Sequence, residues 1–400
     1  MPCPHVGLVH WTAAPAVGGV ESYLADLVRA LQRRDVEVTL VTSTSPGRLR
    51  GALAPCPVVE TELLDPHVAR QGSGSAAYRR ALHSFLRGAV RDHGLEIVHA
   101  HNAQMFNPAV AHELVALRSD GAVSGVHHTA HSFPSGSVTR AMDGFDVSYA
   151  VSDCVARRWR AVLRRTAVEV LYLGVDTSRF RPPTADAPDG GPVVIVHPAR
   201  LVADKGANLS IRMLARLRAE GVDAQLVLTD TPETADDAGV LDAHRAAIRR
   251  LIDDRGLAPH VRMVTVPFER MPALYQSADV VVYPSVGAEP LGLAPLEAMS
   301  CARPVLVSHN GGMRETIIHG ATGLTFPSGD AEAFTERVRE LLANPASARR
   351  LGANGRRRVL ARFSIERHAD AMVARYRAHG RRAPRRRPAP YAASVLTSNL

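Results

Sequence analysis

The chain has 400 residues, of which 46% are apolar and 22% are charged, a balance typical of a soluble globular protein with room for two domains of ordinary size. Its net charge of +9 is of the size found in proteins that bind nucleic acids or anionic membranes. Five arginines, however, lie in the Pro/Ala-rich residues 380–400, and without them the net charge falls from +9 to +4. Composition therefore argues against nucleic-acid binding by the part of the chain that precedes residue 380.

Neither the cysteines nor the apolar runs indicate a secreted or membrane-spanning protein. The four cysteines form no Cys-x-x-Cys pair, and their spacing matches no metal site. The first thirty residues show no basic segment followed by an apolar core, and no apolar run approaches the roughly 18 residues that span a bilayer. We therefore expect reduced thiols, a cytoplasmic protein and a disordered basic tail at residues 380–400.

Short apolar runs alternate with helical patterns along the first half of the chain. Helices are expected where apolar side chains recur at helical spacing, and strands where β-branched and apolar residues gather. Strands are predicted at residues 6–10, 36–42, 97–101, 147–151 and 168–173, and helices at 20–31, 76–91 and 152–165. This alternation indicates a parallel sheet with helices on both faces.

Prolines and glycines cluster at residues 176–192 and mark an interdomain linker. In the second alternating series that follows, strands are predicted at 193–196, 225–229, 261–266, 280–283 and 305–308, and helices at 208–218, 242–254 and 293–300. We therefore predict an α/β fold of two facing doubly wound Rossmann-like domains with an interdomain cleft, since ligands bind at the carboxyl ends of such strands. The predicted boundaries are 1–178 for the first domain, 179–192 for the linker, 193–362 for the second domain, 363–379 for a final helix and 380–400 for the tail.

Lys205 is the only lysine among 48 basic residues, the others all being arginine. It follows the predicted strand 193–196 and precedes Gly206 and a helical pattern. A compact ammonium group at the start of a helix is suited to bind a phosphate at close range. The alternative is a surface lysine without a function.

Two glutamates flank the start of the helix predicted at 293–300. Glu289 lies in the preceding loop and Glu297 about one turn inside the helix. The backbone N–H groups of Leu291, Gly292 and Leu293 are expected to be free to bind an anion. Carboxylates beside an anion site suit a ligand that carries hydroxyl groups next to a phosphate. Most glutamate pairs at this spacing are ordinary surface charges, so the ordered run around them carries the argument.

Six segments of the chain resemble, in order, motifs of the retaining GT-B glycosyltransferases of family 4, over roughly residues 5–375. They are Gly18-Gly19-Val20-Glu21, Thr129-Ala130-His131, residues 173–182, Arg200 with Lys205, the Glu289 to Glu297 run, and Gly311-Gly312 with residues 320–324. The resemblance implies an enzyme that transfers a sugar from a nucleotide donor. It also implies that the first domain binds the acceptor, that the second binds the nucleotide sugar, and that the final helix returns to the first domain.

The resemblance implies a role for each matching residue. Arg200 and Lys205 would neutralise the donor diphosphate, Glu289 would bind the transferred sugar and Glu297 the ribose hydroxyls. His131 would contact the sugar near its 6-position. The donor would also be bound by Gly18, Gly19, Leu291, Gly292 and Leu293.

Acceptor contacts are expected from residues at strand ends on the cleft side of the first domain. The candidates are His101, Asn102, Glu21 and Trp11. A metal site is the alternative for the histidines near residues 99–101 and 127–131, but strand-end histidines more often bind polar substrates or satisfy backbone groups. We expect no metal.

The sequence favours a reaction without a cofactor. No Asp-x-Asp occurs in the chain, so protein cations and helix dipoles would stabilise the departing diphosphate. Retention of configuration and a UDP-linked donor are implied by the resemblance alone. The arginine bias suggests a GC-rich bacterial source, and hence a small polar acceptor in secondary metabolism such as antibiotic biosynthesis. The chain departs from the family at Leu291, Ser132 and Arg314, where phenylalanine, aspartate and proline are common.

Three alternatives remain at this point. The basic helix predicted at 76–91 suits a lipid or phosphoinositide acceptor at a membrane, although a helix that buries its apolar stripe explains the same pattern. A GT-B nucleotide-sugar epimerase would share the cleft and take no acceptor. A nucleic-acid or membrane binder would act through its basic tail. We expect nucleotide sugar and acceptor as partners, with no nucleic acid and no membrane contact; the oligomeric state is not predicted.

Overall fold

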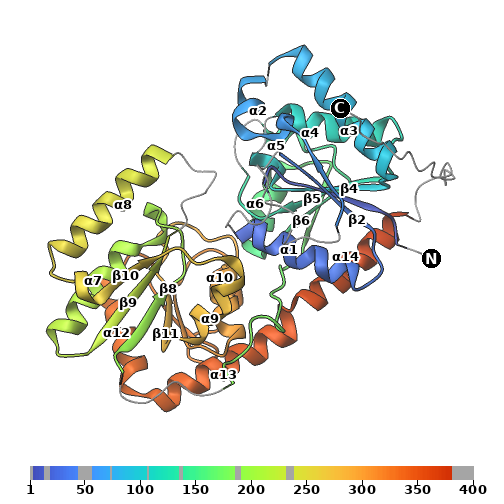
Figure 1. Cartoon of the computed structure of the whole chain (residues 1–400). Coiled ribbons are helices and arrows are strands. Elements are labelled where there is room, and N and C mark those ends of the chain that lie inside the picture. The colour runs from blue at the N-terminus through green and yellow to red at the C-terminus, as the bar shows by residue number, and fades with distance from the viewer. Residues whose placement is uncertain are drawn as a thin grey trace, which may run out of the picture.

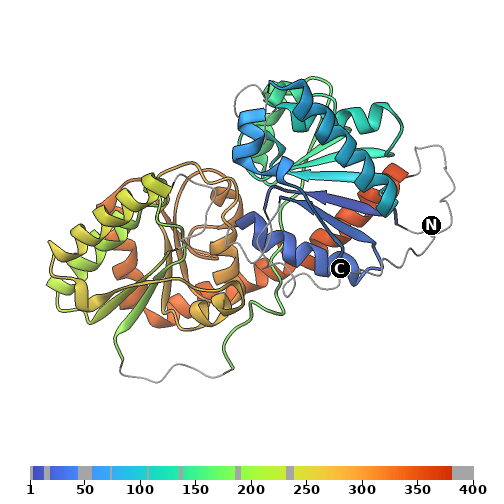
Figure 2. The same ribbon diagram turned by 45° about the horizontal axis from the view of Figure 1, so that its top comes forward.

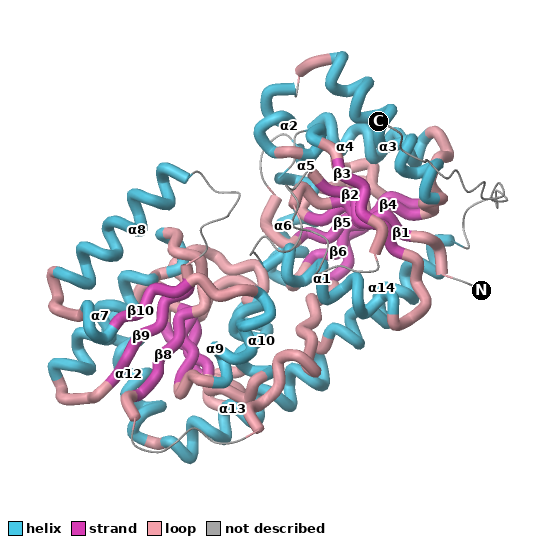
Figure 3. Tube along the Cα trace, viewed as in Figure 1, coloured by secondary structure: helices cyan, strands magenta, loops and turns pink. Residues whose placement is uncertain are grey.

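The computed structural model describes residues 3–12, 19–43, 56–72, 74–105, 108–134, 138–184, 191–230 and 238–380. It contains two α/β domains, each with a parallel sheet covered by helices (Figures 1 and 3). The predicted fold class is therefore confirmed. Apart from Gly380 at the end of the final helix, the predicted basic tail lies outside the described residues.

The first sheet has seven parallel strands in the order β3-β2-β1-β4-β5-β6-β7. Its core strands β1, β2, β4, β5 and β6 are buried along their whole length, as expected of strands covered on both faces. The strands are β1 (Val6–Val9), β2 (Val38–Thr42), β3 (Val58–Glu60), β4 (Ile97–His101), β5 (Gly125–Ala130), β6 (Val147–Ala150) and β7 (Ala167–Val170), and the helices are α1 (Gly19–Gln32), η1 (Glu62–Leu64), α2 (Pro66–Gly72), α3 (Ala76–His93), η2 (Ala103–Met105), α4 (Pro108–Ser119), α5 (Val138–Ala141) and α6 (Asp153–Val162).

The second sheet has six parallel strands in the order β10-β9-β8-β11-β12-β13. Its strands are β8 (Val193–His197), β9 (Ala224–Thr229), β10 (Val261–Val264), β11 (Val280–Tyr283), β12 (Val305–Ser308) and β13 (Leu324–Phe326), and its helices are η3 (Ala203–Lys205), α7 (Ala207–Ala219), α8 (Ala238–Asp253), η4 (Ala258–His260), η5 (Phe268–Arg270), α9 (Met271–Gln276), α10 (Leu293–Ser300), α11 (Met313–Thr316), α12 (Ala331–Ala343) and α13 (Pro345–Arg362).

Each sheet has one point at which the strand order reverses. These points lie between β1 and β4 in the first sheet and between β8 and β11 in the second. Ligands of doubly wound folds bind beyond the carboxyl ends of the strands at such points. The loops that follow these four strands carry most of the site residues predicted from the sequence.

The last described helix, α14 (Ile365–Gly380), runs from the second domain onto the first and packs against α1 (Figures 1 and 2). The Tyr23 hydroxyl of α1 hydrogen-bonds His368 Nε2 at 2.7 Å, and His99 Nδ1 on β4 hydrogen-bonds the Tyr376 hydroxyl at 2.6 Å. All four side chains are buried. Residues near the end of the described chain therefore complete the core of the first domain.

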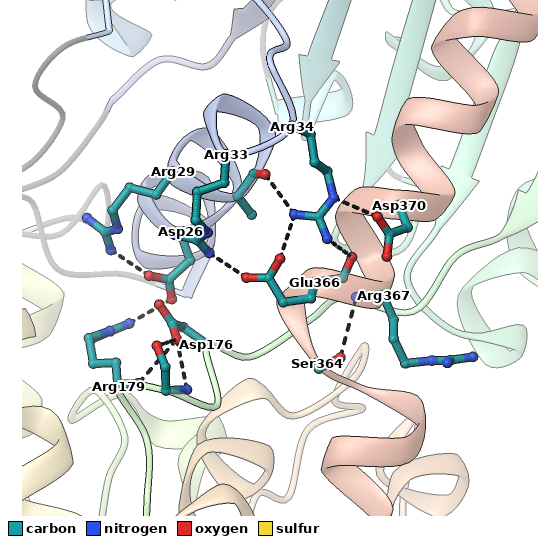
Figure 4. A network of polar contacts seen from close by, with 12 residues as sticks. Asp26, Arg29, Arg33, Arg34, Asp176, Arg179, Ser364, Glu366, Arg367 and Asp370 are labelled. Carbon is teal, nitrogen blue, oxygen red and sulfur yellow. Dashed lines mark hydrogen bonds and ion pairs between the residues drawn. The ribbon is translucent and has the colours of Figure 1, made fainter.

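Ion pairs at the edge of this contact tie α1 to α14 (Figure 4). Arg34 donates to Glu366 Oε2 at 2.5 Å and to Asp370 Oδ1 at 2.7 Å. Exposed pairs of this kind contribute little individually, so the buried hydrogen bonds and apolar packing hold α14 in place.

Strand β5 was not predicted, because His127 and His128 interrupt its apolar pattern. Both rings are buried and have partners in neighbouring elements: His127 bonds the Tyr149 hydroxyl at 3.2 Å, and His128 bonds Ser148 Oγ at 2.8 Å. Among the described residues, His127 Nε2 is buried without a hydrogen-bond partner, so this ring is held in the central strand by one hydrogen bond and by its edge-on packing against Tyr149. Helices α4, α12 and α13 were also not predicted.

Helix α3 buries the apolar stripe that made a membrane-surface helix an alternative. Tyr78, Leu82 and Leu86 are buried, and the helix packs against α4. Of its arginines, Arg79 pairs with Glu113 of α4 and Arg87 with Asp120. Among the described helices, none is long and apolar enough to cross a bilayer.

Candidate active site

Lys205 is the last residue of the short helix η3. Backbone contacts of the residues on either side of it, Asp204 and Gly206, fix its position. Gly206 follows it at φ +76°, and a Cβ there would lie 2.1 Å from the carbonyl oxygen of Pro284. The carbonyl of Asp204 accepts hydrogen bonds from the N–H groups of Val286 at 2.7 Å and Gly287 at 3.2 Å. The loop that carries Lys205 is thereby fixed to the loop that follows β11.

Lys205 forms an ion pair with Glu289 at the carboxyl end of the second sheet. Its Nζ donates to Glu289 Oε2 at 2.8 Å, while Asp204 Oδ2 lies 3.3 Å away. Burial alone would lower the pKa of Lys205, but Tyr283, Glu289 and Asp204 outweigh it and raise the pKa above its usual value. Lys205 therefore keeps its positive charge at neutral pH.

Arg200 belongs to the same charged group. Burial raises the pKa of the Tyr283 hydroxyl and Glu289 adds to the rise, whereas Lys205 and Arg200 oppose it. The two cations predicted to bind a diphosphate therefore both act electrostatically on Tyr283. Tyr283 also donates to Glu289 Oε2, at 3.4 Å.

The N-termini of α1 and α10 meet between the two domains (Figure 1). Gly19 begins α1 and Leu293 begins α10, and a Cβ on Gly19 would lie 3.9 Å from Leu293 Cδ1. Both helix ends present backbone N–H groups and a partial positive charge. Leu291 is buried beside them, whereas Gly18 lies outside the described residues. The predicted donor residues Gly19, Leu291 and Leu293 thus lie together at the junction of the two domains.

Glu297 lies one turn into α10 and is partly buried. The Tyr275 hydroxyl donates to its Oε2 at 2.8 Å. Burial raises the pKa of Glu297 to about 7; Tyr275 and Arg179 oppose the rise and Asp26 adds to it. This carboxyl group therefore titrates near neutral pH.

His131 lies at the end of β5 and is buried. Its Nε2 hydrogen-bonds His101 Nδ1 at 3.0 Å, and its backbone N–H donates to Asn102 Oδ1 at 3.1 Å. Asn102 adopts φ +52°, an uncommon conformation that asparagine tolerates better than most residues. Burial and neighbouring histidines hold the pKa of His131 well below its usual value, so the ring is neutral at physiological pH.

The other residues predicted to face the acceptor join the same group. His10 Nε2 lies 3.3 Å from Glu21 Oε1, and His10 Nδ1 hydrogen-bonds the carbonyl of His101 at 3.1 Å. The Trp11 ring lies 4.0 Å from that of His10, between centroids. The ends of β1, β4 and β5 thus bring together Trp11, Glu21, His101, Asn102 and His131. The His101 side chain is fully buried beside His131.

Two family descriptions match the chain. "Glycosyltransferase Family 4" matches residues 17–179 and "Glycosyl transferases group 1" matches residues 183–358. The chain belongs to the GT-B glycosyltransferases. It is therefore an enzyme, and the two descriptions meet at the junction between its two sheets.

Curated proteins resemble this glycosyltransferase over nearly the whole chain or over about half of it. A glycogen synthase of Mycobacterium tuberculosis is 27% identical over 95% of this chain and 96% of its own. A GDP-mannose-dependent alpha-(1-6)-phosphatidylinositol monomannoside mannosyltransferase of Mycolicibacterium smegmatis is 34% identical over 48% of this chain and 51% of its own.

Solved structures match the fold. Sucrose-phosphate synthase of Thermosynechococcus elongatus superposes with a TM-score of 0.78 at 23% identity, covering 94% of this chain and 98% of that one. Anabaena HepE in complex with UDP and glucose gives 0.75 at 17% identity, covering 94% and 100%.

One contact between the glycosyltransferase's two domains, made by Arg179, was not predicted from the sequence (Figure 4). Arg179 donates to Asp26 Oδ2 on α1 at 2.7 Å, and its guanidinium lies 3.8 Å from the centroid of the Phe268 ring in the second domain. Asp176 Oδ1 accepts from the Arg179 N–H at 3.1 Å and fixes the turn. The only feature of the sequence that could have indicated this contact is Asp26, a carboxylate on the apolar face of α1.

Within the described ranges, no group of three or more His, Cys, Asp and Glu side chains is placed to hold a metal ion. All four cysteines of the transferase lie in described segments and are unpaired.

Proposed function

We propose that this glycosyltransferase transfers a sugar from a UDP-linked donor to a small polar acceptor, with retention of anomeric configuration and without a metal ion. The observation that carries the proposal is the Lys205–Glu289 pair at 2.8 Å. It sits in the loop region that also leads into α10, whose N-terminus faces Gly19 of α1. Cations, helix N-termini and carboxylates together suit a ligand with a diphosphate and sugar hydroxyls.

In the proposed reaction, the bond between the anomeric carbon and the diphosphate oxygen breaks while the acceptor oxygen bonds to that carbon. The acceptor O–H bond breaks in the same step, and its proton passes to the departing diphosphate oxygen. Negative charge grows on the departing diphosphate, and Lys205, Arg200 and the two helix N-termini stabilise it electrostatically. Lys205 is already fixed by the Asp204 carbonyl contacts, so little reorganisation is needed. We assign no covalent nucleophile.

The carboxylates would orient the donor. Glu289 uses Oε2 for Lys205, which leaves Oε1 to accept from the hydroxyls of the transferred sugar. Glu297 would accept from the ribose hydroxyls, and the neutral His131 ring would contact the sugar near its 6-position. The first domain would supply the acceptor side through Trp11, Glu21, His101 and Asn102.

The choice of UDP is supported by the complexes of HepE with UDP and with UDP-glucose. A second candidate is a GDP-mannose donor with a phosphoinositide acceptor. It is favoured by the 34% identity over 204 residues to the phosphatidylinositol monomannoside mannosyltransferase.

The first experiment measures thermal unfolding with UDP, GDP and ADP in EDTA for the wild type, Lys205→Ala and Arg212→Ala. Arg212 is an exposed cation on α7 and serves as the matched control. A ligand at 100 times its Kd stabilises by about 2.7 kcal/mol, a shift of several degrees in a chain of this size. We expect UDP to raise the Tm of the wild type and of Arg212→Ala but not of Lys205→Ala.

A rise in Tm with GDP alone would contradict a UDP-linked donor and favour the second candidate, a GDP-mannose donor. No shift with any nucleotide, or an equal shift in Lys205→Ala, would overturn the proposed site. Product mass then separates transfer from epimerisation, since an epimerase yields an isomer of the donor and no new glycoside.

A further inference from the structure

We propose that Tyr275 is a positioning residue for donor binding: its hydroxyl holds one oxygen of Glu297 so that the other is presented to the donor ribose. The inference rests on the proposed function, in which Glu297 binds the ribose hydroxyls, and adds a residue to it that no sequence motif marks.

The position of the Tyr275 hydroxyl is set by its surroundings. Tyr275 lies on α9, is fully buried, and packs edge-on against Phe180 with ring centroids 5.8 Å apart. The ring therefore has little freedom, and its hydroxyl donates to Glu297 Oε2 at 2.8 Å. Within the described chain Glu297 Oε1 accepts no hydrogen bond, so one oxygen is fixed and the other is available.

A hydrogen bond from Tyr275 also affects the charge of Glu297. Four groups face this carboxyl: Tyr275 from α9, Arg179 from the interdomain turn, Asp26 from α1 and Cys301 at the end of α10. Burial raises the pKa of Glu297 to about 7, and the Tyr275 hydrogen bond counteracts burial more than any other group. An ionised carboxylate accepts from hydroxyls through both oxygens, whereas a protonated one loses an acceptor. Tyr275 thus favours the form that accepts from ribose.

The same arrangement recurs at the other glutamate of the site. Glu289 uses Oε2 for both Lys205 and the Tyr283 hydroxyl, and its Oε1 accepts from no described residue. Each glutamate is thus held through one oxygen by a buried tyrosine of the second domain. Tyr275 and Tyr283 are eight residues apart, as are Glu289 and Glu297.

The test compares wild type, Tyr275→Phe and Glu297→Gln by calorimetric titration with UDP and with 2′,3′-dideoxy-UDP. Phenylalanine keeps the ring packing and removes only the hydroxyl. We expect Tyr275→Phe to bind UDP about tenfold more weakly and dideoxy-UDP as well as the wild type does. A purely structural role for the hydroxyl would weaken both ligands equally, and that result would overturn the inference.

The pH dependence gives a second readout. UDP affinity should fall as pH drops through the Glu297 pKa, which is about 7, because protonation removes an acceptor. Since Tyr275 opposes the rise of this pKa, its removal should move the fall to higher pH. Tyr149→Phe is the control, because the buried Tyr149 hydroxyl bonds His127 in the first domain. The UDP affinity of this variant, and the pH at which that affinity falls by half, should match those of the wild type.

Failure of the inference and failure of the proposed function look different. If Glu297→Gln weakens UDP while Tyr275→Phe changes neither affinity nor midpoint, the inference falls and the proposed donor site stands. If Glu297→Gln binds UDP as the wild type does, the ribose role in the proposed function falls, and the role of Tyr275 with it.

Discussion

Glu315 of the second domain caps helix α6 of the first, because its Oε2 accepts the backbone N–H of Asp153 at 2.8 Å. Its Oε1 accepts the N–H of Cys154 at 2.8 Å, and the Tyr172 hydroxyl donates to Oε2 at 2.9 Å. A carboxylate at a helix N-terminus satisfies free N–H groups and interacts favourably with the helix dipole. Beside it, Ser152 donates to the carbonyl of Pro290 at 2.7 Å, so the relative position of the domains is linked to the loop of Glu289.

Replacing Glu315 with Gln should destabilise the contact between the domains. The amide group has one acceptor oxygen where the carboxylate has two, so an N–H of α6 loses its charged partner, at a cost of about 1–3 kcal/mol. Thermal unfolding should show a lower Tm, while Glu336→Gln, at an exposed pair with Arg339, should leave the Tm unchanged. Equal melting of the two variants would mean that the cap contributes nothing to stability.

Gly311→Ala should lower turnover, because the change displaces the loop that carries Glu289. Gly311 has φ +50°, and a Cβ there would lie 2.0 Å from the carbonyl oxygen of Glu289, so the loop that aims Glu289 must move. Gly320→Ala is the matched control, because Gly320 has φ +71° and open space around it. Both should lose about 1–2 kcal/mol of stability from the left-handed backbone, and Gly311→Ala should lose more because its Cβ also displaces the loop of Glu289. Turnover should fall at least tenfold, but only in Gly311→Ala, and comparable turnover in the two variants would contradict this.

Gly19→Ala tests the junction of α1 and α10 from the other side. The added methyl group would meet Leu293 Cδ1 at 3.9 Å, an ordinary contact. The free energy of unfolding of the free protein should therefore change by no more than about 0.5 kcal/mol. A diphosphate between the two helix ends would need that space, and UDP affinity should fall at least tenfold. Unchanged UDP binding by titration would show that the phosphates lie elsewhere.

The donor residues could be predicted from the sequence because each belongs to a short segment with its own pattern. Lys205 follows a strand and precedes a glycine, and Glu289 and Glu297 bracket one helix start. The contacts between the domains have no such pattern: Arg179 meets Asp26 across 153 positions and Glu315 meets Asp153 across 162. Such pairs depend on how the two sheets are oriented, which local periodicity does not determine.

Acid should unfold the first domain before the second. Burial lowers the pKa of His127 and His128 to about 3 and that of His368 to about 4, and holds those of His99, His101 and His131 well below their usual value. An unfolded histidine titrates near about 6.5, so below that pH the unfolded chain binds more protons. Stability should therefore fall as pH drops from about 6.5 towards 3, by up to about 1.4 kcal/mol per pH unit for each proton.

Tryptophan emission can follow this loss, because Trp11 and Trp159 both lie in the first domain. Trp159 is fully buried and packs edge-on against His128, with ring centroids 5.3 Å apart. As the pH is lowered, its emission should shift to the red first. Opening of strands β8 to β12 in the second domain, followed by hydrogen exchange, should begin only at a lower pH. Simultaneous loss in both domains would show that the histidines do not control acid unfolding.

Helix α14 determines the order in which the newly made chain can finish folding. At roughly 5–20 residues per second, synthesis of the approximately 200 residues between β7 and the end of α14 takes roughly 10–40 s. During that time the second domain emerges and can form its own sheet. The domain that is translated first is thus the last to be completed. A ribosome that stalls in the second domain carries a first domain in which the Tyr23 hydroxyl and His99 Nδ1 still lack their hydrogen-bond partners.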